Sequence, residues 1–221
     1  MKYSDLLVAS FISSLVTVSN TSVQDGVSCA NGSNVKAAWL DVVFVVELST
    51  HTSSQWNSIT GKILTIISQL PLSNMPSLSN TSRVAVIGYS STFESKVLYS
   101  FADTQLLRNI QFVLNNARPT ETSDKADIAS GLRGAKKHLD TNKSFRVPSI
   151  VLVAATYDDS GAHNPNTAAN ELKANGYKLI TISYDASNGV KTNSGRKKRN
   201  FIGVYSGGSA YRVLRRPWLL G

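Results

Sequence analysis

The chain has 221 residues, of which 42% are hydrophobic, so it is long enough for one domain with a substantial core and too short for two large ones. Its formal net charge of +9 would suit an anionic partner, but much of the excess lies late, at Lys191, Arg196 to Arg199 and Arg212 to Arg216. The body of the protein is therefore much less basic than the total, and we expect no nucleic-acid partner.

The first 18 residues have the pattern of a secretory signal peptide. Met1-Lys2 is a weakly positive start, and Leu6 to Val18 is an apolar and small-residue run too short to span a bilayer. Val16 and Val18 are suitably placed for cleavage near Ser19. The alternative is a buried N-terminal helix or strand. We expect a signal peptide over residues 1–18 and a secreted, extracellular protein without a membrane span.

Four N-glycosylation sequons support passage through the secretory route. Each lies in a predicted loop or linker, where an attached sugar reaches solvent; they begin at Asn20, Asn31, Asn80 and Asn142. We expect a glycoprotein modified at these positions.

Residues 19–36 read as a polar tether, and it contains the single cysteine, Cys29. No internal disulfide is possible, so the domain must be stable on its hydrophobic core. An unpaired thiol in an oxidising compartment could join two chains into a homodimer through Cys29; a free or capped thiol without a role is the alternative.

Strands and helices alternate from Ala37 onward. Predicted strands are rich in β-branched residues and mostly continuous in apolarity, which is typical of a sheet covered by helices on both faces; they are Leu40 to Val46, Arg83 to Tyr89, Lys96 to Phe101, Pro148 to Ala155 and Lys178 to Ser183. Apolar stripes predict helices over Trp56 to Leu70, Leu106 to Leu114 and Ile128 to Leu139.

A further helix has both ends signalled, by Asn164 as N-cap with Pro165 at its first position, and by Gly176 just past its end. The link Ser91 to Ser95 is too short for a crossover, so the third strand should pair antiparallel at an edge. The sequence predicts an α/β fold: a doubly wound, mostly parallel sheet with helices on both faces and one antiparallel edge strand.

Four segments together resemble the von Willebrand factor type A domain, in particular the secreted nematode branch in which it often accompanies a C-type lectin domain. They are Trp39 to Ser49, Ser82 to Ser90, Ser130 to Ala135 and Ser149 to Ala155. The resemblance covers roughly Val35 to Ser183. We expect the domain over residues 37–213, followed by a short basic and apolar tail over residues 214–221.

The resemblance also implies a place for a divalent ion, at the carboxyl ends of the strands. The family often uses Asp-x-Ser-x-Ser after the first strand, a Thr before a middle helix and an Asp after the fourth strand. The corresponding residues here form a degenerate set: Glu47, Ser49, His51, Thr122 (or Ser123, since the Thr position itself falls near Ala126) and Asp158, with Tyr157 at the expected Asp.

Glu47 is one methylene too long for an octahedral Mg²⁺ shell with bonds of about 2.0–2.1 Å, and an imidazole replaces the second hydroxyl. We therefore expect no cofactor, with Mg²⁺ as the alternative. Imidazoles and carboxylates in these loops also suit Zn²⁺, but no short ligand spacing links the two histidines; the set is His51, His163, Glu47, Asp158 and Asp159. We expect His51 and His163 to be solvated loop residues, and His138 to be exposed on its helix.

Catalysis is disfavoured. Ser49 and His51 are two residues apart on a strand-to-loop turn, where neighbouring side chains point apart, and the glycines of a nucleophile elbow are missing. No glycine-rich phosphate loop follows the first strand. We expect no enzyme.

Two functions remain open. One is a secreted adhesion module that binds an extracellular protein or glycan through the loops Glu47 to Ser54, Pro119 to Asp127 and Thr156 to His163. The other is a vestigial structural or assembly domain without metal. In this second function a disulfide through Cys29 could link two chains into a dimer.

After the fifth strand the resemblance implies another strand and a final helix. Phe201 to Tyr205 fits the strand, and the element after it is either truncated or remodelled. The basic run that ends at Arg199 fits a processing site for a secretory protease, with a solvated loop as the alternative.

Overall fold

The computed structural model describes residues 38–75, 80–91, 94–119, 126–156, 164–184, 202–206 and 209–212. Strand β1 (Leu40–Glu47) lies inside the sheet, and all of its residues are buried. It pairs in parallel with β2 (Arg83–Tyr89) on one side and with β4 (Val147–Ala154) on the other. Strand β5 (Lys178–Ser183) continues the parallel part beyond β4. The continuous apolar runs therefore correspond to strands covered on both faces, and the predicted fold class is confirmed.

Strand β3 (Lys96–Tyr99) pairs antiparallel with β2, as the short link predicts. It is short, carries a register shift and begins with an exposed lysine, three features that protect a sheet edge from pairing with another chain. On the other side, β6 (Ile202–Ser206) pairs antiparallel with β5, and β7 (Ser209–Arg212) with β6. Among the described residues the strand order is β3-β2-β1-β4-β5-β6-β7. The segment after the predicted strand at Phe201 to Tyr205 is thus remodelled into a further strand at 209–212.

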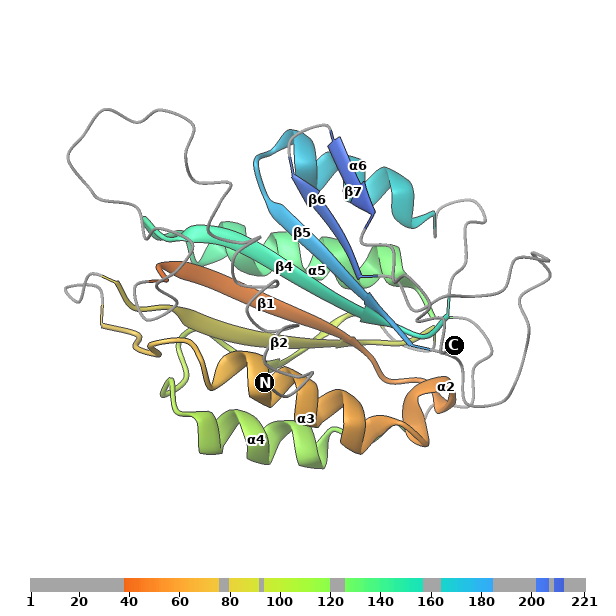
Figure 1. The fold of residues 1–221 in the computed structure, drawn as a ribbon, viewed down its shortest axis with the longest axis horizontal. Coiled ribbons are helices and arrows are strands. Elements are labelled where there is room, and N and C mark those ends of the chain that lie inside the picture. The colour runs from red at the N-terminus through yellow and green to blue at the C-terminus, as the bar shows by residue number, and fades with distance from the viewer. Residues whose placement is uncertain are drawn as a thin grey trace, which may run out of the picture.

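Helices cover both faces of the sheet (Figure 1). On one face lie α3 (Trp56–Ile67) and α4 (Leu107–Asn116), and on the other α5 (Ile128–Thr141) and α6 (Pro165–Ala174). The short α2 (Thr50–Ser53) follows the end of β1. Side chains alternate along β1, so that Phe44 packs into the core under α3 and α4 while Val45 packs into the core under α5 and α6.

The ends of α6 are those that the sequence predicts. The Asn164 side chain accepts a hydrogen bond from the Asn166 amide at 2.9 Å, Pro165 opens the helix, and Gly176 has a φ of 81° just beyond its end.

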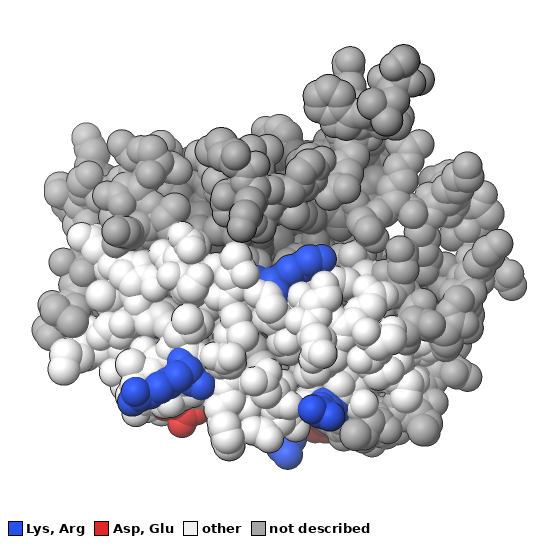
Figure 2. Space-filling model, turned by 60° about the horizontal axis from the view of Figure 1, so that its bottom comes forward, with Lys and Arg blue, Asp and Glu red and all other residues white. Residues whose placement is uncertain are grey.

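The face formed by α3 and α4 carries few charged side chains (Figure 2). Lys62 is the single charged residue of α3, and Arg108 that of α4. This face therefore offers little attraction to an anionic partner.

Helix α5 lies so close to the sheet that it has no room for a methyl group at Gly131. A Cβ there would lie 2.8 Å from Cγ1 of Val45 and 3.0 Å from the Tyr89 ring. Gly61 in α3 is its natural control, because a Cβ there would meet nothing within 4 Å.

We expect Gly131→Ala to lower the free energy of unfolding by about 1–3 kcal/mol, because it overpacks the core. Gly61→Ala should raise it by about 0.5–1 kcal/mol, because alanine is the better helix former. Urea denaturation measures both. Equal effects of the same sign at the two positions would contradict the close contact of α5.

Candidate functional site

The candidate site lies at the carboxyl edge of the sheet, where the parallel strands end, and Glu47 is at its centre. Glu47 is the last residue of β1 and is fully buried. Its Oε2 accepts hydrogen bonds from the amides of Ala155 at 2.7 Å and Thr156 at 3.0 Å. Its Oε1 accepts from the hydroxyls of Thr156 at 3.0 Å and Ser49 at 2.5 Å. Because Ala155 and Thr156 directly follow β4, this one carboxylate ties the end of β1 to the end of β4.

Short-range contacts fold the segment after Glu47 back onto the strand. Ser49 is the N-cap of α2, and its hydroxyl accepts a hydrogen bond from the His51 amide at 3.2 Å. The Thr52 hydroxyl donates to the backbone oxygens of Glu47 at 3.0 Å and Ser49 at 2.8 Å. His51 is only 2% exposed, so the prediction of a solvated loop residue is wrong. Its polar neighbours in the sequence suggested solvent, but α2 packs against the domain.

Tyr89 fills the space beside Glu47. The two residues are paired in register at the ends of β2 and β1, and Tyr89 is fully buried. Burial raises the pKa of the Tyr89 hydroxyl well above its usual value, and the negative charges of Glu47 and Asp127 raise it further. The phenol is therefore neutral at physiological pH.

The loop before α5 is anchored by its own N-cap. Asp127 accepts a hydrogen bond from the Ser130 amide at 2.9 Å through Oδ1, and its own amide donates to the Ser90 carbonyl at 3.4 Å. Ala126, at the expected Thr position, is buried beside it and offers no side-chain oxygen.

The structure brings Glu47 and Ser49 into direct contact, and the His51 amide donates to the same Ser49 hydroxyl. The other candidate residues lie outside the described residues; these are Thr122, Ser123, Tyr157, Asp158, Asp159, His163, Cys29, Asn20, Asn31 and Arg199. Sequence reasoning assigned no role to Tyr89 or to the Thr156 hydroxyl. For Thr156 the sequence offered one signal: its hydroxyl comes directly after the predicted strand Pro148 to Ala155. For Tyr89 it offered none.

A separate groove of about 540 Å³ lies between α5 and the edge strand β3, with Glu94, Arg133 and Lys137 among its lining residues. His138 also lines it, and its predicted exposure is wrong. Its ring stacks on Phe101 with the centroids 5.0 Å apart, and its Nε2 is buried without a hydrogen-bond partner among the described residues. Burial lowers the pKa of His138, and the nearby positive charge of Arg83 lowers it further. The groove is a mixed polar and apolar surface that reaches the carboxyl edge, because Asp127 and Ser130 also line it.

A family model of the von Willebrand factor type A domain matches residues 41–201. The chain belongs to this family. The match runs from the second residue of β1 to the residue directly before β6, so it includes Glu47 and the loops around it.

The chain is similar at low sequence identity to a curated protein. C-type lectin domain-containing protein 160 of Caenorhabditis elegans is 23% identical over 154 residues, which is 67% of this chain and 24% of that protein. The chain thus spans about a quarter of the length of the curated relative that it matches.

Two solved structures show the fold. Proximal thread matrix protein 1 from the mussel byssus, with a zinc-occupied MIDAS motif, has a TM-score of 0.56 and 15% identity over 66% of this chain and 38% of that one. The manganese-loaded TRAP protein of Plasmodium vivax has a TM-score of 0.55 and 16% identity over 73% of this chain and 66% of that one.

The described residues at the carboxyl edge do not fit the ion that several von Willebrand factor type A domains bind. Both oxygens of Glu47 already accept two hydrogen bonds each, which uses the lone pairs that an ion would need. The Ser49 hydroxyl points its proton at Glu47 and accepts from His51. An ion would have to displace buried hydrogen bonds that nothing else replaces, and each buried group left unsatisfied costs about 1–3 kcal/mol. Within the described ranges no three His, Cys, Asp or Glu residues gather in a group suited to a metal.

We expect millimolar Mg²⁺ to leave the melting temperature unchanged relative to a chelator, because the Glu47 oxygens are already engaged. An ion held at 100 times its Kd would stabilise the fold by about 2.7 kcal/mol, so scanning calorimetry would detect it easily. A clear rise in melting temperature would mean that Asp158 or Thr122 completes a shell around a rearranged Glu47.

Proposed function

We propose that this chain is a secreted, non-catalytic recognition module that binds an extracellular protein or glycan through the loops at the carboxyl edge, without an ion. Membership of the von Willebrand factor type A family supports the class, because the family consists largely of adhesion and protein-interaction modules. The signal-like residues 1–18 and the sequons support secretion. In the part of the chain that the structure describes, no helix is long and apolar enough to cross a membrane.

The observation that carries the proposal is the Glu47 hydrogen-bond network. It fixes the first residues of two of the three candidate loops, the loop after β1 and the loop after β4. A binding surface whose loops are held in place before the partner arrives loses less conformational entropy on binding. In this proposal the carboxylate does the anchoring, so capture of the partner is independent of divalent ions.

A pull-down from extracellular fluid with the immobilised domain tests this function. Ser54, exposed at the end of α2, and Gln111, exposed on α4, are matched positions for a new charge. Ser54→Glu should abolish capture of the partner, whereas Gln111→Glu should retain it, and a chelator should change neither result.

The alternative is a structural or assembly domain. It predicts no specific capture, or equal capture by both variants, together with a dimer on non-reducing gels that Cys29→Ser converts to a monomer.

A further inference from the structure

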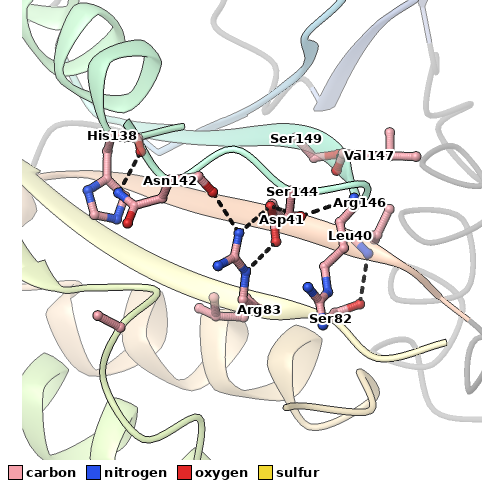
Figure 3. A network of polar contacts seen from close by, with 12 residues as sticks. Leu40, Asp41, Ser82, Arg83, His138, Asn142, Ser144, Arg146, Val147 and Ser149 are labelled. Carbon is pink, nitrogen blue, oxygen red and sulfur yellow. Dashed lines mark hydrogen bonds and ion pairs between the residues drawn. The ribbon is translucent and has the colours of Figure 1, made fainter. Parts of the chain in front are cut away.

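A buried polar network ties the opposite, amino edge of the sheet together (Figure 3). Asp41 at the start of β1 is only 3% exposed. Its carboxylate accepts from Arg83 through Nε at 2.8 Å and Nη2 at 2.7 Å, and from the Ser144 hydroxyl at 2.7 Å. Arg83 also donates to the backbone oxygen of Asn142 at 2.8 Å. One buried acid thus holds the turn between α5 and β4 against the sheet.

Both functional residues of the sequon Asn142-Lys143-Ser144 belong to this network. Asn142 is the half-buried C-cap of α5, and its Nδ2 donates to the backbone oxygen of His138 at 2.9 Å. Ser144 donates to Asp41 and accepts from the Arg146 amide at 3.1 Å. Figure 3 shows Asn142 turned toward His138, and Ser144 toward Asp41. The nitrogen that would carry a sugar therefore faces a helix terminus.

The sequon Asn80-Thr81-Ser82 differs at its asparagine, although its serine is buried. Asn80 is exposed and adopts a φ of 64°, a left-handed conformation that asparagine tolerates. The backbone after it is held in place: Arg146 donates to Thr81 O at 2.7 Å, and the Ser82 hydroxyl donates to Ala38 O at 2.9 Å. Asn80 thus directly precedes a backbone segment that is held in place, and its own side chain is in solvent.

We propose that the folded protein carries an N-linked oligosaccharide on Asn80 and none on Asn142. This rests on the proposed secretion, and it revises the expectation that Asn142 is modified. In the reaction the amide nitrogen forms a bond to the anomeric carbon of a lipid diphosphate-linked oligosaccharide. The bond from that carbon to the phosphate oxygen breaks, the lipid diphosphate leaves with the electron pair, and the amide loses one proton. At Asn142 the same substitution would place a sugar against the end of α5.

The surroundings of Asn80 add a reason for a sugar there. Met75 is 58% exposed and Phe145 is 92% exposed. The Arg146 guanidinium connects their loops, because it donates to Met75 O at 3.3 Å and to Thr81 O, and Phe145 precedes it in the chain. An oligosaccharide on Asn80 covers these apolar side chains. It also stays at the amino edge and leaves the loops at the carboxyl edge open.

Site mapping on secreted protein tests the proposal. The chain is expressed in glycosylating cells with its own N-terminus and, in parallel, with an unrelated secretory leader. Enzymatic release converts each glycan-bearing Asn to Asp, which peptide mass spectrometry locates. Asn80→Asp should remove one glycan and leave the melting temperature unchanged, because aspartate tolerates the same left-handed conformation. Asn142→Gln should leave the glycan mass unchanged and lower the melting temperature by about 2–4 °C, because it loses the C-cap hydrogen bond.

The two leaders separate the glycosylation inference from the proposed secretion. A glycan on Asn142 of the folded protein, or a bare Asn80 behind the unrelated leader, overturns this inference. Glycosylation of Asn80 with the unrelated leader but not with the native N-terminus supports the inference and contradicts secretion.

Discussion

Glu47→Ala should lower the free energy of unfolding by about 2–6 kcal/mol, one of the two largest effects that we expect. The substitution leaves the amides of Ala155 and Thr156 buried without an acceptor, and each such group costs about 1–3 kcal/mol. Glu47→Gln should cost less. Its amide oxygen can still accept from the two backbone amides, while the Ser49 and Thr156 hydroxyls can rotate to accept from its amide nitrogen.

Glu47→Asp should resemble the alanine variant, because the shorter side chain does not reach the end of β4. Urea denaturation gives the order, and Glu94→Ala serves as the control, since Glu94 is an exposed carboxylate whose loss should stay within about 0.5 kcal/mol. If Glu47→Ala had the same free energy of unfolding as Glu94→Ala, the hydrogen bonds between β1 and β4 would contribute nothing to stability.

Val45→Asp should prevent folding altogether. Val45 is fully buried in the middle of β1, between Ile87 of β2 and Leu152 of β4. The Cγ1 of Val45 lies 2.8 Å from the position of a Cβ on Gly131, so neither water nor a new partner can reach an aspartate there. Burying an unpaired charge costs several kcal/mol, against a total stability of about 5–15 kcal/mol. Circular dichroism and the yield of soluble secreted protein measure the outcome.

His51→Ala is the variant to compare with Val45→Asp. A solvated His51 would make this substitution neutral, but His51 is buried, so we expect a loss of about 0.5–3 kcal/mol with the fold retained. A secretion level equal to that of the unchanged chain would show that the burial of His51 contributes little. Complete loss, as for Val45→Asp, would point to a structural role of His51 beyond its packing.

The strands and the larger helices were predictable because their signals are local. The continuous apolar run of β1, the stripe of α5 and the caps of α6 each lie within a few residues in the sequence. Strand β7 was not predictable from the short segment that follows Gly208, since its pairing with β6 decides its conformation.

The site was only partly predictable, because its geometry comes from contacts across the chain. The acid at the end of β1 stands out in the sequence, but its acceptor role depends on the amide of Ala155, which is 108 residues away. His51 and His138 have polar neighbours in the sequence, and their burial comes from the packing of α2 and from the ring of Phe101. Local polarity cannot report such distant partners.

The position of β1 in the sheet sets the order in which the protein is assembled during synthesis. Strand β1 is made first, and its partner β2 follows soon, but the end of β4 emerges only 108 residues after Glu47. At about 5–20 residues per second, roughly 5–20 seconds pass before this second partner leaves the ribosome. Throughout this interval one side of an apolar strand has unpaired backbone groups, which are prone to aggregation. Chaperone demand should therefore fall sharply once Thr156 has emerged from the ribosome.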